Sequence, residues 1–364
     1  MANWTLTEGD VDDLADGCAL LGSGGGGESH SFRIVLRSLL AERGPVEVLD
    51  ASTLAPDALA VNVGFVGAPI VMTEKLFCEQ TVVLALEGMS RRLGRRIEAV
   101  MPAEIGGANG LSAFIAAALL GVPVVDADGM GRAFPMSDQI TYAIYGRSAS
   151  PTIATTEHGD VICVEGSSNR RVEMLVRALS SANGAQCFTA DYPLSGEDVR
   201  ACAVIGSISL ARLIGVSLNA ARREHRDLLA ALAAALSDVG GVAVRSLFDG
   251  KVTDCRHETR GGFGFGIASL ESIPPGERMT VEFQNEYLVA RRNGVAVATT
   301  PDIISIVDAE TLANIGSESV RYGQRVKVIA IEAPVLMTTP PALAVVGPRA
   351  FGFDLDYHPI RTTP

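Results

Sequence analysis

Short apolar strands alternate with helices over the first 130 residues, and this alternation restricts the possible folds more than any other feature. The expected strands are residues 46–49, 59–65, 99–102 and 122–126. The expected helices are residues 7–21, 31–43, 74–93 and 111–120. Strands that alternate with helices in this way are typical of an α/β domain with a largely parallel sheet. We therefore expect an N-terminal α/β domain.

The pattern changes after about residue 150. Residues 152–164 predict a hairpin, and residues 172–182 and 207–236 predict helices. From residue 242 onward the chain consists of short strands and turns, with a strong hairpin signal at Asn293-Gly294. This part predicts a small β-barrel or sandwich. We place the two domains at 1–165 and 166–364, with a chain that can cross back between them.

Charge and cysteine usage restrict the partners. The formal net charge of −12 disfavours nucleic acid and anionic membranes, because both require a basic surface. The six cysteines are dispersed and form no CxxC pair, and no apolar run reaches the ~18 residues that cross a bilayer. We expect a cytoplasmic protein with reduced thiols and a small-molecule substrate. We also expect a homo-oligomer.

A run of glycines between the first two helices is the strongest local signal. It comprises Ser23, Gly24, Gly25, Gly26 and Gly27. Glycines let the backbone take positive φ values and let its N–H groups approach a ligand closely, and a helix start adds partial positive charge. The run predicts a cradle for an anion or a carbonyl group. The alternative is a turn that only connects the two helices.

Polar side chains follow two expected strands. Glu104 and Asn109 come after the strand that ends at residue 102, and Asp126, Asp128 and Arg132 come after the next one. Ligands of open α/β sheets bind at the carboxyl ends of strands, so we expect these groups to share one site with the glycine run. The three acids can hold a divalent metal or supply a general base. The alternatives are a helix cap at Asn109 and an Asp–Arg ion pair that braces the loop.

Three further residues are weaker candidates. Cys255 and His257 lie two apart on an expected strand, so they can share a face as a thiol and its base. Glu74 opens an expected helix, where an acid is also favourable for the helix itself.

Eight ordered motifs resemble one family. They are GSGGGGESH, GAPIVMTEK, EIGGANG, VVDADGMGRAFP, DGKVTD, PDIISIVD, RYGQRVKVIA and VGPRAFGFDLDYHPI. Together they resemble the S-methyl thiohydantoin desulfurase-like family, which is associated with hydantoinase and oxoprolinase systems. The resemblance covers nearly the whole chain. It implies an N-terminal three-layer α/β domain and a C-terminal β-barrel-like domain.

The resemblance also implies an activity and its residues. The implied reaction is hydrolysis of the exocyclic C–S bond of a five-membered ring, which releases a thiol and leaves a hydantoin. By motif, the site falls on the glycines and on Glu74, Glu104, Asn109, Asp126, Asp128 and Arg132. At 254–257 this chain has Cys255 and His257 where the family has an aliphatic residue and an arginine. The alternatives are an accessory subunit that partners a hydantoinase-type enzyme, and a different ring-opening amidohydrolase.

Overall fold

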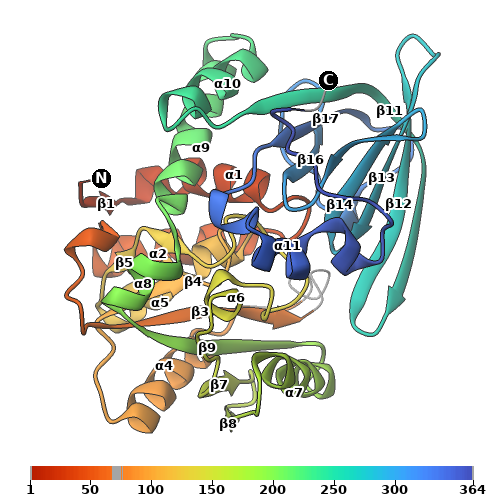
Figure 1. Ribbon diagram of the computed structural model, residues 1–364. Coiled ribbons are helices and arrows are strands. Elements are labelled where there is room, and N and C mark those ends of the chain that lie inside the picture. Colours follow the sequence, from red (N-terminus) through yellow and green to blue (C-terminus); the bar gives the residue numbers. More distant parts are fainter. Residues whose placement is uncertain (1, 68–74, 76, 363–364) are drawn as a thin grey trace.

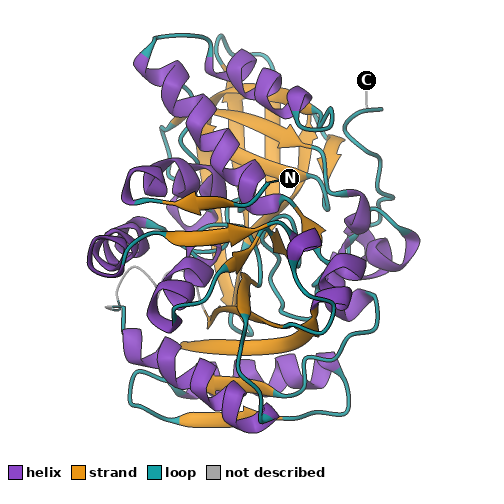
Figure 2. Cartoon of the chain, turned by 90° about the vertical axis from the view of Figure 1, so that its left-hand side faces the viewer, coloured by secondary structure: helices purple, strands orange, loops and turns teal. Residues whose placement is uncertain are grey.

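The computed structural model describes residues 2–67, 75 and 77–362, and its chain forms two large sheets (Figure 1). The eight-stranded sheet lies below the seven-stranded sheet in Figure 2. A two-stranded ribbon of β6 (Ala127–Asp128) and β10 (Val204–Ile205) completes the described strands. The fold is therefore α/β followed by β, as the sequence predicts.

The eight-stranded sheet is mixed. Its order is β1 (Trp4–Leu6), β2 (Val46–Leu49), β5 (Val124–Val125), β4 (Ala99–Pro102), β3 (Leu59–Gly67), β9 (Gln186–Ser195), β7 (Thr152–Thr155) and β8 (Val161–Val164). The four strands from β2 to β3 are parallel neighbours, and every other pairing is antiparallel. The prediction of a largely parallel sheet is thus correct only for the inner strands. The difference arises because β9 returns along β3, and the hairpin of β7 and β8 is added beyond it.

Two apolar cores cover the two faces of this sheet. Val61 and Val63 of β3 join the core formed with helices on one face, and the intervening side chains face the other core, as the period of a strand requires. The first core takes side chains from α1 (Val11–Leu21), α2 (His30–Arg43), α4 (Glu79–Leu93) and α5 (Asn109–Leu120). The second takes them from α6 (Thr141–Ile144), α7 (Asn169–Ala182), α8 (Gly196–Cys202) and α11 (Pro340–Val346). Helix, sheet and helix form three layers.

A helix pair leads from the first sheet to the second. α9 (Ser207–Arg223) packs on α1, and α10 (Leu228–Asp238) follows it. Glycines permit the close approach of α1 and α9, because a Cβ on Gly17 would lie 1.7 Å from the carbonyl oxygen of Ala211. A Cβ on Gly215 would lie equally close to the carbonyl oxygen of Asp13. The expected helical segment 207–236 is therefore two helices, joined at a turn.

The seven-stranded sheet is antiparallel throughout and curls into a half-barrel. Its order is β15 (Val295–Thr299), β14 (Glu286–Arg292), β13 (Arg278–Gln284), β12 (Phe263–Ser272), β11 (Val244–Arg260), β17 (Arg325–Ile331) and β16 (Ile303–Asp308). β14 contacts β16 across the curl, but the described strands form no ladder that closes the barrel. The predicted hairpin at Asn293-Gly294 is confirmed, and both residues have positive φ, as a type I′ turn requires.

The chain crosses between the two parts. β9 lies beyond residue 165 but belongs to the first sheet, and α11 near the C-terminus packs against the second core of that sheet. Within the described residues, no helix is long and apolar enough to span a bilayer.

Candidate functional site

The glycine run joins α1 to α2 and rests against the second sheet. The backbone N–H of Tyr287 donates to the carbonyl of Ser23 (2.7 Å), and that of Ser317 donates to the carbonyl of Gly24 (2.8 Å). A Cβ on Gly24 would lie 2.3 Å from the Tyr287 ring, and a Cβ on Gly25 would lie 2.0 Å from Oε1 of Glu286. The run is therefore an ordered contact between the two sheets, which only residues without side chains can make.

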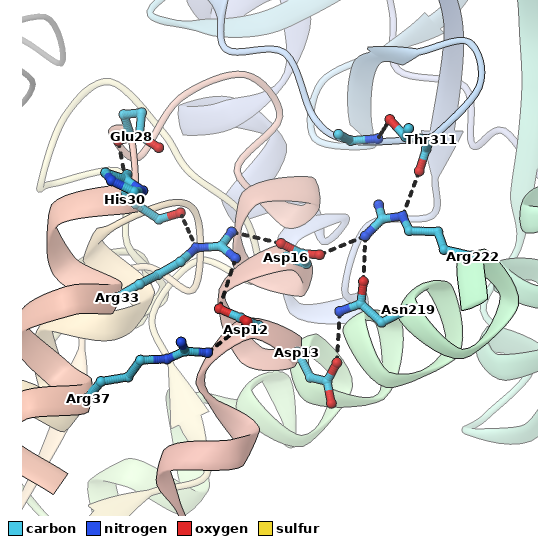
Figure 3. Close-up of polar contacts among 12 residues, drawn as sticks. Asp12, Asp13, Asp16, Glu28, His30, Arg33, Arg37, Asn219, Arg222 and Thr311 are labelled. Atoms are coloured by element: carbon cyan, nitrogen blue, oxygen red, sulfur yellow. Dashed lines mark hydrogen bonds and ion pairs between the residues drawn. The ribbon is translucent and has the colours of Figure 1, made fainter. Parts of the chain in front are cut away.

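An ionic network fixes the chain where the glycine run enters α2 (Figure 3). The guanidinium of Arg33 donates to Asp16 (2.7 Å) on α1 and to the hydroxyl of Ser29 (3.2 Å) at the start of α2. The other oxygen of Asp16 accepts from Arg222 (2.7 Å) on α9. Because three helices meet at one carboxylate, the end of the glycine run has a fixed position.

A cavity opens between the glycine run and the ends of both sheets. Gly26 and Gly27 form one part of its wall, while Ser23, Gly24 and Gly25 are turned toward the second sheet. Other wall residues come from β3, β9, the loops after β4 and β6, α7 and β14. They include Phe65, Glu104, Asn109, Phe134, Arg177, Thr189, Asp191, Asn285 and Glu286. The predicted convergence of the glycine run with Glu104 and Asn109 is confirmed.

Glu104 lies on the wall and is almost fully buried. Its Oε1 accepts from Nδ2 of Asn109 (2.7 Å), and its Oε2 accepts from the backbone N–H of Phe134 (3.2 Å). Asn109 in turn accepts from the backbone N–H of Phe65 (2.8 Å), so β3 orients the amide that orients the acid. Burial raises the pKa of Glu104 to about 7, although the bonds from Asn109 and Phe134 oppose the rise. The carboxyl can therefore accept and return a proton near neutral pH.

Glu286 brings a second carboxyl to the cavity from the first residue of β14. It is 3% exposed, and its Oε2 has no hydrogen-bond partner within the described part of the chain. Burial raises the pKa of Glu286 well above its ordinary value, and repulsion from Glu104 raises it further, while the charge of Arg132 opposes the rise. Burial and the neighbouring charge of Glu104 therefore both favour the protonated form of Glu286.

Asp191 on β9 is a third buried acid of the wall. It accepts from Nδ2 of Asn62 on β3 (2.5 Å), and burial raises its pKa to about 7. Asp191 was not a candidate in the sequence, because β9 was not predicted as a strand. Asn285 and Glu286 carried only a weak signal, since nothing in the sequence places the start of β14 beside the glycine run.

Arg132 does not have the predicted place on the wall. It is fully buried and donates to the backbone carbonyls of Ala133 (2.9 Å), Asp302 (2.8 Å) and Tyr287 (3.0 Å). Two of these carbonyls belong to the second half of the chain, so the side chain ties the two sheets together. The Arg132 guanidinium influences the site only through its positive charge, which lowers the pKa of Glu104 and of Glu286.

Asp126 and Asp128 brace loops and are not part of the described wall of the cavity. Oδ1 of Asp126 accepts from the backbone N–H groups of Ile208 (3.1 Å) and Ser209 (3.0 Å), which caps α9. Oδ2 of Asp128 accepts from the backbone N–H groups of Ile105 (2.9 Å), Met130 (3.0 Å) and Gly131 (2.7 Å). Asp128 thereby positions the residue that follows Glu104.

The expected metal site is not formed. No three side chains of His, Cys, Asp or Glu within the described ranges are grouped so that they could hold a metal ion. Glu104, Asp126 and Asp128 each bond to different backbone N–H groups, as described above, so the prediction that they bind one ion is wrong.

Cys255 and His257 share a face of β11, as predicted, with 3.1 Å between Sγ and Nε2. They do not belong to the described wall of the cavity. Burial raises the pKa of the Cys255 thiol and lowers that of His257. Both changes disfavour the thiolate–imidazolium pair that an activated cysteine requires. Glu74, the remaining candidate, lies outside the described residues.

Comparison with known proteins identifies the family. A search of curated proteins finds no match. The chain is similar to a protein from Chromobacterium violaceum of known crystal structure, with a TM-score of 0.81 and 25% identity over 98% of this chain and 100% of the other. The models of the N-terminal and C-terminal S-Me-THD-like domains match residues 9–166 and 167–360. The chain therefore belongs to the S-methyl thiohydantoin desulfurase-like family.

Proposed function

We propose that this protein hydrolyses the exocyclic C–S bond of an S-methyl thiohydantoin-like ring, with Glu104 as the general base and Glu286 as the general acid. The observation that carries the proposal is that both carboxyls are buried in the wall of one cavity. Burial raises the pKa of both carboxyls, and the charge of Glu104 favours the protonated form of Glu286, as the pairing of a base with an acid requires. Membership of the family supports the choice of substrate class.

The reaction needs one water molecule. Water adds to the ring carbon that carries the S-methyl group, a C–O bond forms, and the water proton passes to the Glu104 carboxylate. As the water adds, the electron pair of the C=N bond moves to the ring nitrogen. The tetrahedral adduct then collapses: its hydroxyl proton passes to this nitrogen, the C=O bond forms, the C–S bond breaks, and the sulfur leaves with its electron pair and takes a proton from Glu286. The products are the hydantoin and methanethiol. Transfer of a proton from Glu104 to Glu286 through solvent restores the starting state.

Neighbouring residues prepare the site for this chemistry. Asn109 fixes the base, and Asp128 holds the backbone that follows it. Arg177 on α7 brings a guanidinium to the wall, where it is held by Glu173 (2.6 Å) and by the carbonyl of Pro135 (3.0 Å). A fixed cation of this kind stabilises the negative charge that develops on a ring oxygen or nitrogen during addition.

Purified protein incubated with S-methyl thiohydantoins tests the proposal. We expect methanethiol and hydantoin, detected by mass spectrometry. Glu104→Gln should lower kcat by about 10²–10⁴-fold, the usual contribution of a positioned acid or base. Glu258→Gln is the matched control, because this glutamate is exposed on β11. The mechanism is refuted if Glu104→Gln retains the wild-type kcat.

The same assay separates the two alternatives. An accessory subunit of a hydantoinase-type enzyme would show no turnover when purified alone. A ring-opening amidohydrolase would give a product that retains sulfur and gains the mass of one water molecule.

A further inference from the structure

A second cavity of about 340 Å³ adjoins the first one. Phe65 and Gln186 line both cavities, so the two lie side by side. The wall of the second cavity also includes Phe32, Phe77, Cys78, Thr81, Thr155, Cys187 and Phe188. The proposed reaction uses none of these last seven side chains.

Four aromatic rings build this wall. Phe32 packs edge-to-face on Phe65 and on Phe77, with ring centroids 5.3 Å apart in both pairs. Phe188 meets Phe65 at 5.0 Å. Phe32 and Phe188 are buried, whereas Phe65 and Phe77 keep part of their surface open to the cavity. Rings that support one another in this way give a preformed apolar surface.

Several polar groups of this cavity already have partners. Nζ of Lys75 pairs with Glu157 at 2.5 Å, and the hydroxyl of Thr155 donates to the backbone carbonyl of Thr81 (2.8 Å). The cation and the anion among the described wall residues therefore neutralise each other. This cavity favours a neutral apolar group over a charged one, since burial of an unpaired charge is costly.

We infer that the second cavity holds the substituent of the substrate ring, and that the substrates are S-methyl thiohydantoin derivatives with an aromatic or large apolar group at C5. This inference rests on the proposed function, because it assumes that the ring itself occupies the first cavity. The volume of the second cavity is sufficient for an aromatic substituent, since an apolar cavity of about 150 Å³ already binds benzene. Phe65 stands at the boundary, where it would contact both the ring and its substituent.

Binding of product analogues tests this inference without turnover. Titration calorimetry with 5-benzylhydantoin and 5-methylhydantoin should show at least a tenfold lower Kd for the benzyl compound, because even one buried methylene is worth about tenfold. Phe77→Ala should remove most of this ratio and leave the Kd of the methyl compound unchanged. Phe353→Ala, a change of the same kind near the C-terminus, should preserve the ratio.

The unmodified protein offers a second test. Cys78 lies in the second cavity and is half-buried, whereas Cys163 on β8 is exposed. Alkylation by iodoacetamide, followed by peptide mass spectrometry, should be slowed at Cys78 by 5-benzylhydantoin and not by 5-methylhydantoin. Cys163 should react at the same rate in both cases.

The outcomes separate the two proposals. Equal affinities for both compounds, or equal reaction of Cys78 with either compound present, would overturn the substituent site. A benzyl preference together with protection of Cys78, but no thiol release from S-methyl derivatives, would support the substituent site and refute the desulfurisation.

Discussion

Replacement of Glu104 by glutamine should change how the stability of the protein depends on pH. The folded protein binds the Glu104 proton with a pKa of about 7, because the carboxyl is buried, whereas the ordinary value is 4.5. Between these two values the folded state keeps the proton and the unfolded state has lost it. The free energy of unfolding therefore falls as the pH rises through this window, and the loss is complete above about pH 7.

The size of this effect follows from the two pKa values. At about 1.4 kcal/mol per pH unit, the difference between 4.5 and about 7 corresponds to about 3 kcal/mol. Glu104→Gln has no proton to lose, so it escapes this penalty. The unfolding entropy is about 2.1 cal/mol/K per residue. When the pH is raised from 4.5 to 8, the difference between the Tm of the variant and that of the wild type should therefore shift by about 4 °C in favour of the variant.

Scanning calorimetry of both proteins at several pH values measures this difference. Asp128, Arg132 and Glu286 face Glu104 in the fold and are present in both proteins. Because the charge of Glu104 raises the pKa of Glu286, the Tm difference reports the loss of the Glu104 titration together with the change that this loss causes at Glu286. The exposed variant Glu258→Gln should track the wild type at every pH. If the Tm difference for Glu104→Gln stays constant across this range, the carboxyl titrates normally and its proposed role as a base near neutral pH fails.

Four further results are expected. The kcat/KM for thiol release should rise with pH through about 7, as Glu104 loses its proton, and a profile that is flat from pH 5 to 8 would contradict a carboxylate base. Asp126→Ala should lower the free energy of unfolding by about 1–2 kcal/mol through loss of the α9 cap, and its kcat should stay within about twofold of the wild-type value. A large loss of kcat in a folded variant would instead show that Asp126 takes part in catalysis. Gly25→Ala should reduce kcat at least about tenfold by displacing Glu286, since the new Cβ would lie 2.0 Å from its Oε1, and a crystal structure of the variant would reveal whether the carboxyl has moved. Cys255→Ala should keep the wild-type rate, because burial raises the pKa of this thiol, whereas loss of turnover would revive the covalent mechanism.

Local patterns predicted the first sheet well where each segment forms its own element. The strands at 46–49 and 99–102 have the expected bounds, because each is a short segment in which apolar residues predominate. β9 escaped prediction for a physical reason: residues 187–192 are buried on both faces of the strand, so polar and apolar residues do not alternate there. Without β9, the arrangement of the outer strands could not be predicted.

The candidate site shows the same limit. Glu104, Asn109 and the glycines could be predicted, because strand ends and glycine turns mark sites by local rules. Asp126 obeys the same rule, but the start of α9, some 80 residues later, uses its carboxylate as a cap. Glu286 comes from another sheet altogether. Such pairings depend on tertiary packing, which a single sequence does not display.

The bonds between the glycine run and the second sheet restrict which halves of different family members can be joined in one chimaeric protein. The two family models meet between residues 166 and 167, which is a natural place to join halves of different members. The bonds from Tyr287 and Ser317 to the run involve backbone groups alone, so most donor sequences could supply them. The space occupied by the side chains of Glu286 and Tyr287 depends on glycine at 24 and 25. A chimaera joined there therefore requires glycine at 24 and 25 in its first half, whichever member supplies the second half.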